Sequence, residues 1–392
     1  MQLIRSSRSR DLRVDFFRGL ALWWIYTDHI PGDVLGDYSL RNFAMCDATE
    51  VFVLLAGFGA GIAYGSVMDR QGYLYAAADT LRRAWTLYIA HIFLFVVYTA
   101  QVAYSAAALD RTFYLEETRL DVLADAPYRA LLEALLLRFQ PSLLNILPLY
   151  VALLLIFALA LPLLRKPALL FAASATAYLA VRLTGINLPA WTGEGWFFNP
   201  FAWQLLFMIG AIMAYAPPRM PRSRWPIDLL ALLVLAAGLI VIWVIDIHPR
   251  VLAAMPAPVI RFVITEDKTG LHPFRLLSIL SLAWLVARSV PRDAAWLRSR
   301  VAAPLVLLGQ NSLPVFCSGI FLGFLARLGL EARDNTAMQI AVNLLGAVAM
   351  VAVAGLTAWY RGKGRASAPT SAPALAQRQP VTLPAVARTD TG

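Results

Sequence analysis

The sequence predicts an all-α membrane protein, a polytopic bundle of about ten transmembrane helices with both termini in the cytoplasm. Hydrophobic residues make up 59% of the 392 residues and charged residues only 15%, against about 45–50% and about 25% in soluble domains. Apolar runs long enough to cross a bilayer, which takes about 20 residues, follow one another along almost the whole chain. Lys and Arg are also shared unevenly between alternate loops, and this bias sets the orientation.

The expected helices follow from the apolar runs and from the charged, Pro or Gly residues that bound them. They lie at residues 14–30, 48–66, 83–107, 143–164, 167–182, 200–216, 227–246, 273–290, 304–326 and 336–360. The transmembrane domain therefore covers residues 14–360, after a basic cytoplasmic segment at 1–13. Residues 361–392 are rich in Ala, Pro, Arg, Ser and Thr without apolar periodicity, which predicts a disordered cytoplasmic tail.

The first helix follows a basic start and superficially resembles a secretory signal peptide. It carries Asp15 and Arg18, however, and lacks a small-x-small cleavage pattern near Pro31. Further apolar runs follow it directly. We therefore expect an uncleaved first helix.

The distribution of positive charge orients the bundle. With the N-terminus inside, the inner segments hold 21 Lys and Arg residues and the outer segments 12. The long loops at 108–142, 183–199 and 247–272 then face outward, where they can meet a large substrate. In the first of these loops, leucines at helical spacing over 128–139 predict an amphipathic helix at the membrane interface.

Several common functions are excluded by composition and motif. The formal charge of +10 is dispersed among short loops rather than gathered on one face, so no nucleic-acid partner is expected. The only cysteines, Cys46 and Cys317, are far apart in the sequence and are expected to be unpaired thiols. The chain has no P-loop, HExxH, GxSxG or cysteine-rich metal motif, so neither these chemistries nor a bound metal is expected.

The first helix contains the strongest candidate site. Ionisable residues within a span are costly, so Asp15, Arg18, Asp28 and His29 need partners or an aqueous cavity. Arg18 and His29 are eleven residues apart, about three turns or roughly 16 Å, so they share one helix face at different depths. His29 would then suit proton transfer near the outer surface, with Asp28 beside it. Alternatively, these charges only anchor the two ends of the helix.

A further carboxylate, Glu50, falls at the outer start of the second helix, level with His29, and is a candidate partner for it. Asp47 is expected to cap the same helix. Glycines at 57, 59, 61 and 65 predict close packing against a neighbouring helix.

Adjacent arginines, Arg82 and Arg83, lie at the expected inner start of the third helix. They either mark the cytoplasmic side or bind the phosphates of a cytosolic donor, for which the guanidinium group is well suited. His91, two turns further, is assigned to helix packing rather than to a cavity.

Later segments supply candidates for substrate binding. Trp196 belongs to an interfacial aromatic belt and could stack on a sugar. The amides Asn199, Gln204 and Asn311 lie at or inside expected spans, where they either join helices or line a channel.

Taken together, these segments resemble the OpgC family, within the superfamily of membrane acyltransferases that includes acyltransferase-3 proteins. The resemblance covers about residues 11–360 and rests on RDLRVDFFRGLALWWIYTDH, EVFVLLAGFGAGIAYG, LRRAWTLYIAH, ILPLY, GWFFNPFAWQLLF and GQNSLPVF. In the superfamily the first helix carries a basic residue and, further along the helix, a histidine. Arg18 and His29 match this pattern. The adjacency of Arg82 and Arg83 departs from the wider pattern, in which the inner arginines are spaced along a turn.

The resemblance implies a multi-pass protein of the bacterial inner membrane that moves an acyl group from cytosolic acyl-CoA to hydroxyls of a periplasmic glucan. For OpgC proteins the donor is succinyl-CoA, and the acyl identity rests on the resemblance alone. Arg18, Arg82 and Arg83 would hold the donor, while His29, assisted by Asp28 or Glu50, would act as general base. A covalent acyl-histidine relay is an alternative. The oligomeric state is not indicated.

Two hypotheses from other classes of protein compete with the acyltransferase hypothesis. Polar helix faces could serve the permeation path of a glycan transporter or flippase, although no internal repeat of the kind common in transporters is evident. The chain could also be a non-catalytic scaffold of a glycan-modifying complex.

Overall fold

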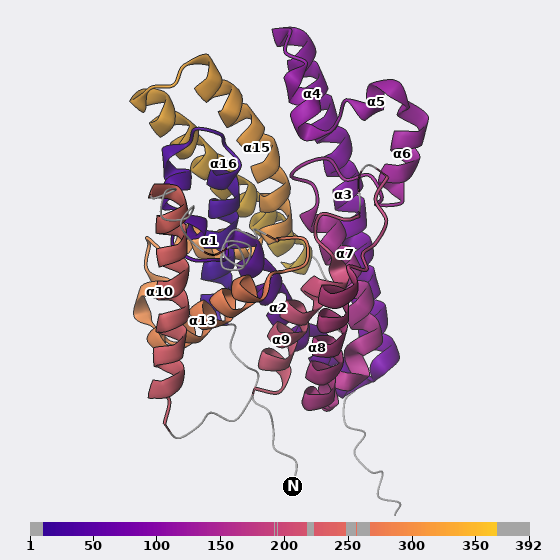
Figure 1. Ribbon diagram of the computed structural model, residues 1–392, viewed down its shortest axis with the longest axis vertical. Helices are drawn as coiled ribbons and strands as arrows, with labels where there is room; N and C mark the ends of the chain where they lie inside the picture. Colours follow the sequence, from indigo (N-terminus) through magenta and orange to yellow (C-terminus); the bar gives the residue numbers. More distant parts are fainter. Residues whose placement is uncertain are drawn as a thin grey trace, which may run out of the picture.

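The computed structural model describes residues 11–191, 193, 195–217, 223–247, 256 and 267–366. These residues form helices joined by turns and loops, with no strand among them, which confirms the all-α class (Figure 1). The larger helices are α1 (Leu12–Asp28), α2 (Ala48–Gln71), α3 (Tyr73–Leu109), α7 (Ile146–Ala160), α8 (Pro167–Thr184), α9 (Pro200–Tyr215), α10 (Trp225–Ile247), α13 (Pro273–Ser289), α14 (Ala303–Gln310), α15 (Ser312–Ala332) and α16 (Thr336–Ala366).

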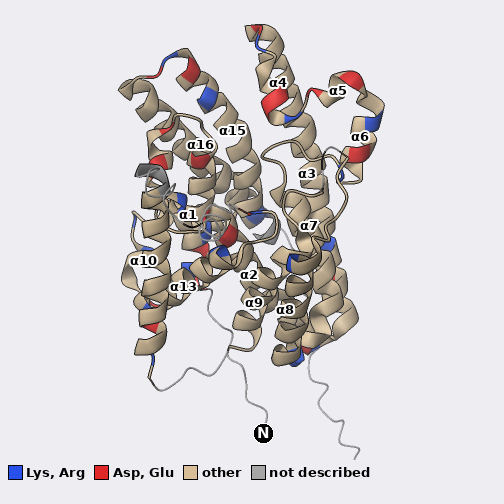
Figure 2. Ribbon diagram, viewed as in Figure 1, with Lys and Arg blue, Asp and Glu red and all other residues tan. Residues whose placement is uncertain are grey.

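Several of these helices can span a membrane. Within the described residues, seven have the necessary length and apolar composition: α2, α3, α8, α10, α15, α16, and α7 extended by the 3-10 turn η3 (Leu161–Arg165). Helices α1, α9 and α13 are shorter, at 16 or 17 residues. Figure 2 shows long stretches of these ribbons without a charged residue. The chain is therefore a multi-pass membrane protein.

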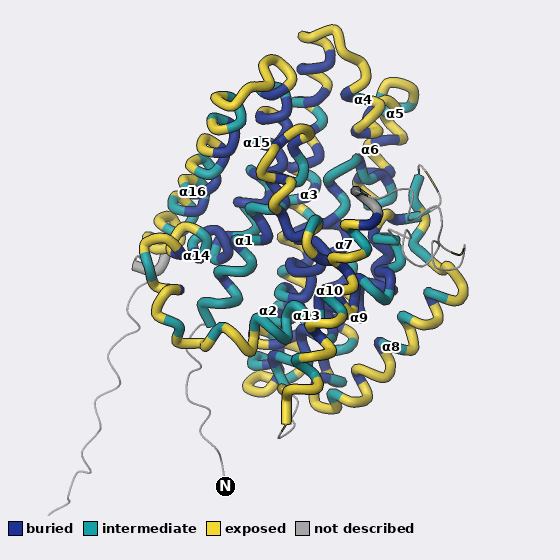
Figure 3. The backbone as a smooth tube through the Cα atoms, turned by 60° about the vertical axis from the view of Figure 1, so that its left-hand side comes forward, coloured by how far each residue is buried: buried dark blue, intermediate teal, exposed yellow. Residues whose placement is uncertain are grey.

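The bundle has an interior group of helices and a rim. Of the apolar 18-residue stretch in each helix, 61% is buried in α7 and 56% in α2, but only 17% in α8 and in α10. Figure 3 shows the same contrast, with exposed residues along α8 and α16 and buried residues inside. The exposed side chains of the rim are largely leucines, such as Leu179 and Leu230, as expected for a surface that faces lipid.

Glycines bring α2 and α9 into backbone contact, as the sequence predicted for this part of α2. A Cβ atom added to Gly57 would clash with the carbonyl oxygen of Phe207, and one added to Gly61 with that of Ala211. Gly210 of α9 meets α2 in the same way at Leu54. Gly59 lies on another face of α2, beside the guanidinium of Arg18. These contacts fix α2, which carries Asp47 and Glu50 at its start.

The predicted bounds differ from the structure by a few residues at several helices, and two of the differences change how the helices connect. Helix α3 begins at Tyr73, ten residues before the expected start, because a single residue, Gly72 with φ of 95°, forms the turn after α2. The first turns of α3 carry charged residues that an apolar window excludes, although Ala-rich sequence favours the helix there. The predicted helix at 304–326 is two helices, since the regular helix is interrupted at Asn311.

The segment between α3 and α7 contains the short helices α4 (Phe113–Thr118), α5 (Val122–Asp125) and α6 (Pro127–Leu135). Helix α6 confirms the predicted amphipathic helix over its first part and ends before Leu137, whose φ is 58°. Residues 1–10 and most of the predicted tail, 367–392, lie outside the described residues. Residues 361–366 continue α16.

Candidate functional site

Two cavities meet where α1 ends and α2 begins. Cavity 1 has a volume of about 700 Å³ and cavity 2 of about 400 Å³, and Asp28 and His29 line both. Trp196 and Lys268 also line cavity 1, and Arg327 lines cavity 2. The histidine that the sequence singles out therefore lies at the junction of the two cavities.

His29 follows the last residue of α1, and the helix itself orients its ring. Nδ1 lies 2.5 Å from the carbonyl oxygen of Ile25. Because a carbonyl oxygen only accepts, we assign the proton to Nδ1, which leaves Nε2 with a free lone pair. Burial lowers the pKa of His29 from its ordinary value of 6.5, opposed in part by the bond to Ile25 and the charge of Asp28. The ring is therefore neutral near pH 7, as a general base requires.

Asp28 precedes His29 in the chain and lies 3.4 Å from the guanidinium of Arg41. Arg41 belongs to the 3-10 turn η2 (Leu40–Asn42) and lines both cavities with Asp28. The negative charge of Asp28 raises the pKa of His29 and so stabilises the imidazolium form. The pair can thus stabilise the charge that His29 acquires when it takes a proton.

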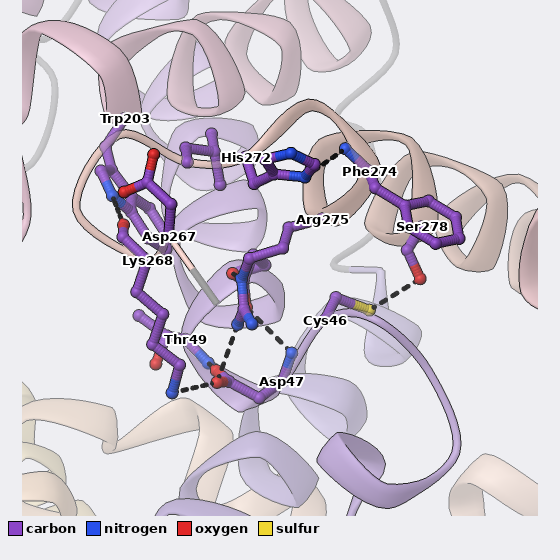
Figure 4. A network of polar contacts seen from close by, with 12 residues as sticks. Cys46, Asp47, Thr49, Trp203, Asp267, Lys268, His272, Phe274, Arg275 and Ser278 are labelled. Atoms are coloured by element: carbon purple, nitrogen blue, oxygen red, sulfur yellow. Dashed lines mark hydrogen bonds and ion pairs between the residues drawn. The ribbon is translucent and has the colours of Figure 1, made fainter. Parts of the chain in front are cut away.

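A buried ionic cluster lies at the start of α2; the Asp47 cluster comprises Asp47, Glu50, Lys268 and Arg275 (Figure 4). Asp47 accepts from Lys268 at 2.6 Å and from Arg275 at 2.9 Å. It also caps α2 by accepting from the backbone N–H of Thr49, as predicted. Burial alone would raise the pKa of Asp47, but the two cations hold it well below its usual range. Asp47 and Lys268 line cavity 1 as a permanent ion pair.

Glu50, a predicted catalytic residue, has no exposed surface and completes this cluster. It pairs with Nε of Arg275 at 2.7 Å and accepts from the backbone N–H of Asp47 at 2.9 Å, which makes a reciprocal capping box. Neither cavity is lined by Glu50. Its contacts therefore hold Asp47 and Arg275 in place and do not reach the open space beside His29.

Of the predicted substrate-binding residues, only Trp196 lines a described cavity, and its side chain is 7% exposed. Asn199 caps α9 and donates to the carbonyl of Ile186 at 2.7 Å. Gln204 joins α9 to α8 by donating to the carbonyl of Ser174 at 2.8 Å. Asn311 accepts from Arg361 at 3.2 Å, which joins the break after α14 to α16. Asn199 therefore ties the start of α9 to the loop after α8, whereas Gln204 and Asn311 join helices.

The predicted donor-binding arginines lie elsewhere, and none of them lines either cavity. Arg18 reaches from α1 to α2 and donates to the carbonyl of Leu55 at 2.9 Å. Arg82 is largely exposed and lies 3.7 Å from Asp79. Arg83, next to it in α3, is partly buried. Arg82 and Arg83 are thus presented near the end of the bundle where α2 passes into α3.

Four further residues bear on the packing and on the site, and of these only His91 was singled out in the sequence. His91 is fully buried, as expected for helix packing, and its ring nitrogens have no hydrogen-bond partner among the described residues. Asn145 precedes α7 and lines cavity 1, and its carbonyl oxygen is buried without a described partner. Arg275 could have been found, because it is a charged residue near the start of a predicted span and so needs a partner. Lys268 lies in a loop, and no sequence pattern indicates its role.

The two cysteines are unpaired, as predicted: Cys46 is buried beside Ser278 and Cys317 is partly exposed.

No curated protein and no solved structure matches the chain. The family model described as OpgC protein matches residues 10–362, which is nearly the whole chain and includes every residue of the site described above. The chain therefore belongs to the OpgC family.

Proposed function

We propose that this protein transfers a succinyl group from cytosolic succinyl-CoA to a hydroxyl group of a periplasmic glucan, in the bacterial inner membrane. Membership of the OpgC family implies an acyltransferase that acts on periplasmic glucans. The observation that carries the proposal is the imidazole of His29 at the junction of two cavities, with Nδ1 bound to Ile25 and no hydrogen bond to Nε2 from any described residue.

In the proposed reaction, Nε2 of His29 takes the proton of the sugar hydroxyl. The hydroxyl oxygen forms a bond to the thioester carbon, the carbon–sulfur bond breaks, and the thiolate of CoA leaves. The proton then passes from His29 to that thiolate, which restores the neutral ring. The carboxylates of Asp28 and Asp47 stabilise the imidazolium between these steps, since both raise the pKa of His29. Glu50 contributes by fixing Asp47.

The charges of cavity 1 support an anionic acyl group. Among the described residues, four cations line it, Arg41, Arg119, Arg138 and Lys268, against the two carboxylates Asp28 and Asp47. This excess of positive charge favours a group with its own carboxylate, such as succinyl, over a neutral group such as acetyl.

For the donor nucleotide, Arg82 and Arg83 are the proposed contacts. The side chain of Arg82 is 82% exposed, and its described ion pair with Asp79 is long, so its donors are available to a phosphate. Arg18, midway along α1, would lie beside the pantetheine arm as the thioester approaches His29. The metal-free chemistry proposed here needs only the acyl-CoA as a co-substrate.

The acceptor side of the site has the composition of a sugar-binding surface. Trp196 offers an aromatic face, and the amides of Gln140, Asn145 and Asn187 line the same cavity. Amides both donate and accept, which matches the hydroxyl groups of a carbohydrate. Asn199 supports this surface by donating to the carbonyl of Ile186, next to Asn187, whereas Gln204 and Asn311 join helices away from it.

Mass analysis of periplasmic glucans tests the proposal directly. Glucans from cells that contain the protein should carry succinyl esters, and glucans from cells without it should lack them. Restoring the wild-type chain should restore the esters, whereas a chain with His29→Ala should not. Identical glucans in all of these strains would contradict the proposal, and a different ester mass would revise the donor.

A further inference from the structure

Several residues line both cavities, and hydrogen bonds hold part of this shared lining in place. Besides Asp28, His29 and Arg41, the segment Ser142–Leu143 and Ile320 of α15 line both cavities. Ser142 is attached to the end of α4, since its backbone N–H donates to Thr118 at 3.0 Å and its hydroxyl to Glu117 at 3.1 Å. A ligand that crosses from one cavity to the other therefore passes the side chain of His29.

Cavity 2 has features that suit an uncharged, hydroxyl-rich ligand. The rings of Tyr98 and Phe324 line it and form an edge-to-face pair with centroids 6.1 Å apart. Asp33 is only 5% exposed, yet its Oδ2 atom has no hydrogen-bond partner among the described residues. Burying an acceptor without a donor is costly, so a ligand hydroxyl group would stabilise this site.

The charges of cavity 2 argue against the acyl donor as its occupant. Of the residues that the structure describes, four carboxylates line it, Asp28, Asp33, Asp37 and Glu117, against two cations, Arg41 and Arg327. Arg327 is already paired with Glu117 at 2.6 Å. A succinyl carboxylate or a CoA phosphate would meet like charge there, whereas an unmodified sugar would not. Cavity 1 has the opposite balance and receives the anionic group.

We propose that the acceptor glucan lies through both cavities at once, with unmodified units in cavity 2 and the unit to be acylated beside His29. This inference rests on the proposed function and adds the mode of acceptor binding. A chain that continues on both sides of the reacting unit is modified at internal units. An enzyme with a single acceptor pocket would instead favour chain ends.

Gly323 provides a variant that fills cavity 2. It lines that cavity, and a Cβ atom added there meets only Ile30, at 4.0 Å, so a larger side chain would extend into the open space. The matched control is Gly355→Phe on α16, where an added Cβ meets nothing within 4 Å and neither cavity is lined. Gly323→Leu, a smaller change at the same position, serves if Gly323→Phe does not fold.

The test is calorimetric binding of linear gluco-oligosaccharides, from disaccharide to octasaccharide, to the full-length protein in nanodiscs without donor. Affinity should rise with length in the wild type and in Gly355→Phe. In Gly323→Phe the rise should stop at a shorter length, with a loss of about tenfold for the longest chain and none for the disaccharide. Fragmentation mass spectrometry of the acylated product should place the esters on internal units.

Affinity that does not depend on length, equal binding of long chains by Gly323→Phe, or esters on terminal units alone would overturn the inference. Because binding is measured without donor, the two proposals fail separately. Length-dependent binding without transfer from any acyl-CoA would contradict the proposed function. Acyl transfer by a protein whose glucan affinity does not depend on chain length would contradict the proposal that the acceptor lies through both cavities. The proposed acyltransferase function would remain.

Discussion

The ring of His29 is turned by the helix that precedes it, through Nδ1, which donates to the carbonyl oxygen of Ile25 at 2.5 Å. An end-of-helix carbonyl has no partner within the helix, so this bond satisfies it and fixes the tautomer of the ring at the same time. The arrangement leaves Nε2 as the only ring nitrogen able to accept a proton. The proposed chemistry depends on this one contact.

The pH dependence of transfer should reflect the neutral form of His29. Burial lowers the pKa of His29 below its ordinary value of 6.5, so a base that must be unprotonated is already active at neutral pH. The rate of transfer at low acceptor concentration should fall towards acid pH with a midpoint below pH 6.5. A profile whose acidic limb has its midpoint above pH 6.5 would assign the proton transfer to another group.

Breaking the Asp47 cluster should destabilise the protein according to the burial of the residue removed. Arg275→Met leaves Glu50 and Asp47 without their shared buried cation, which should cost about 3–5 kcal/mol. Lys268→Met is the matched control, because the side chain of Lys268 is 37% exposed and Asp47 keeps Arg275. Thermal unfolding in detergent should rank the variants, and adding Glu50→Gln to Arg275→Met should recover part of the loss. Equal melting temperatures for both single variants would contradict this account of the cluster.

The contact between α2 and α9 should not tolerate a methyl group. Gly57→Ala forces apart two backbones that touch at Phe207, and overpacking of this kind costs about 1–3 kcal/mol. Gly355→Ala makes the same change in open space and should leave the melting temperature unchanged or slightly raised. If both variants melt alike, the close approach of the two helices is not a source of stability.

Replacing Arg82 and Arg83 together with Ala should weaken acyl-CoA binding about tenfold or more, because two charge-assisted phosphate contacts are lost. The control is the double change Arg298→Ala and Arg300→Ala, which removes two exposed arginines from another segment predicted to face the cytoplasm. Donor binding by microscale thermophoresis would separate the two pairs. Unchanged affinity in the first pair would mean that Arg82 and Arg83 are only topological signals.

The sequence predicted the helices well because, in a bilayer, the backbone N–H and C=O groups of each span must be hydrogen-bonded within that span. The local apolar pattern is therefore enough to locate each helix. It also placed His29 and Asp28 correctly at the end of α1, since charged residues are rare in a span and stand out. The break at Asn311 was missed because the apolar pattern continues through it. The early start of α3 was missed because the apolar pattern begins only later in that helix. Both depend on local backbone geometry that hydropathy does not report.

The partners of Glu50 could not be predicted. Because Glu50 was expected at the same membrane depth as His29, the two residues were predicted to share a site. Glu50 instead pairs with Arg275, which lies 225 positions away in the sequence. A single sequence gives no measure of which helices are neighbours, so charges at equal depth have several possible partners. The amides Asn199, Gln204 and Asn311 show the same limit: the residue type indicates that a partner exists, and only the fold shows that the partner is a loop carbonyl for Asn199 and another helix for Gln204 and Asn311.

The most direct test of the account is the turnover of His29→Ala, normalised to the amount of folded protein that binds acyl-CoA. Succinyl transfer from succinyl-CoA to a glucan should fall by at least about a hundredfold, as is typical when a general base is removed, while donor binding stays at the wild-type level. In Glu50→Gln, which keeps an acceptor for the cap of α2, normalised turnover should fall much less, and the amount of folded protein should fall instead. A His29→Ala protein that binds donor and transfers acyl groups at the wild-type rate would contradict the central claim that His29 is the base.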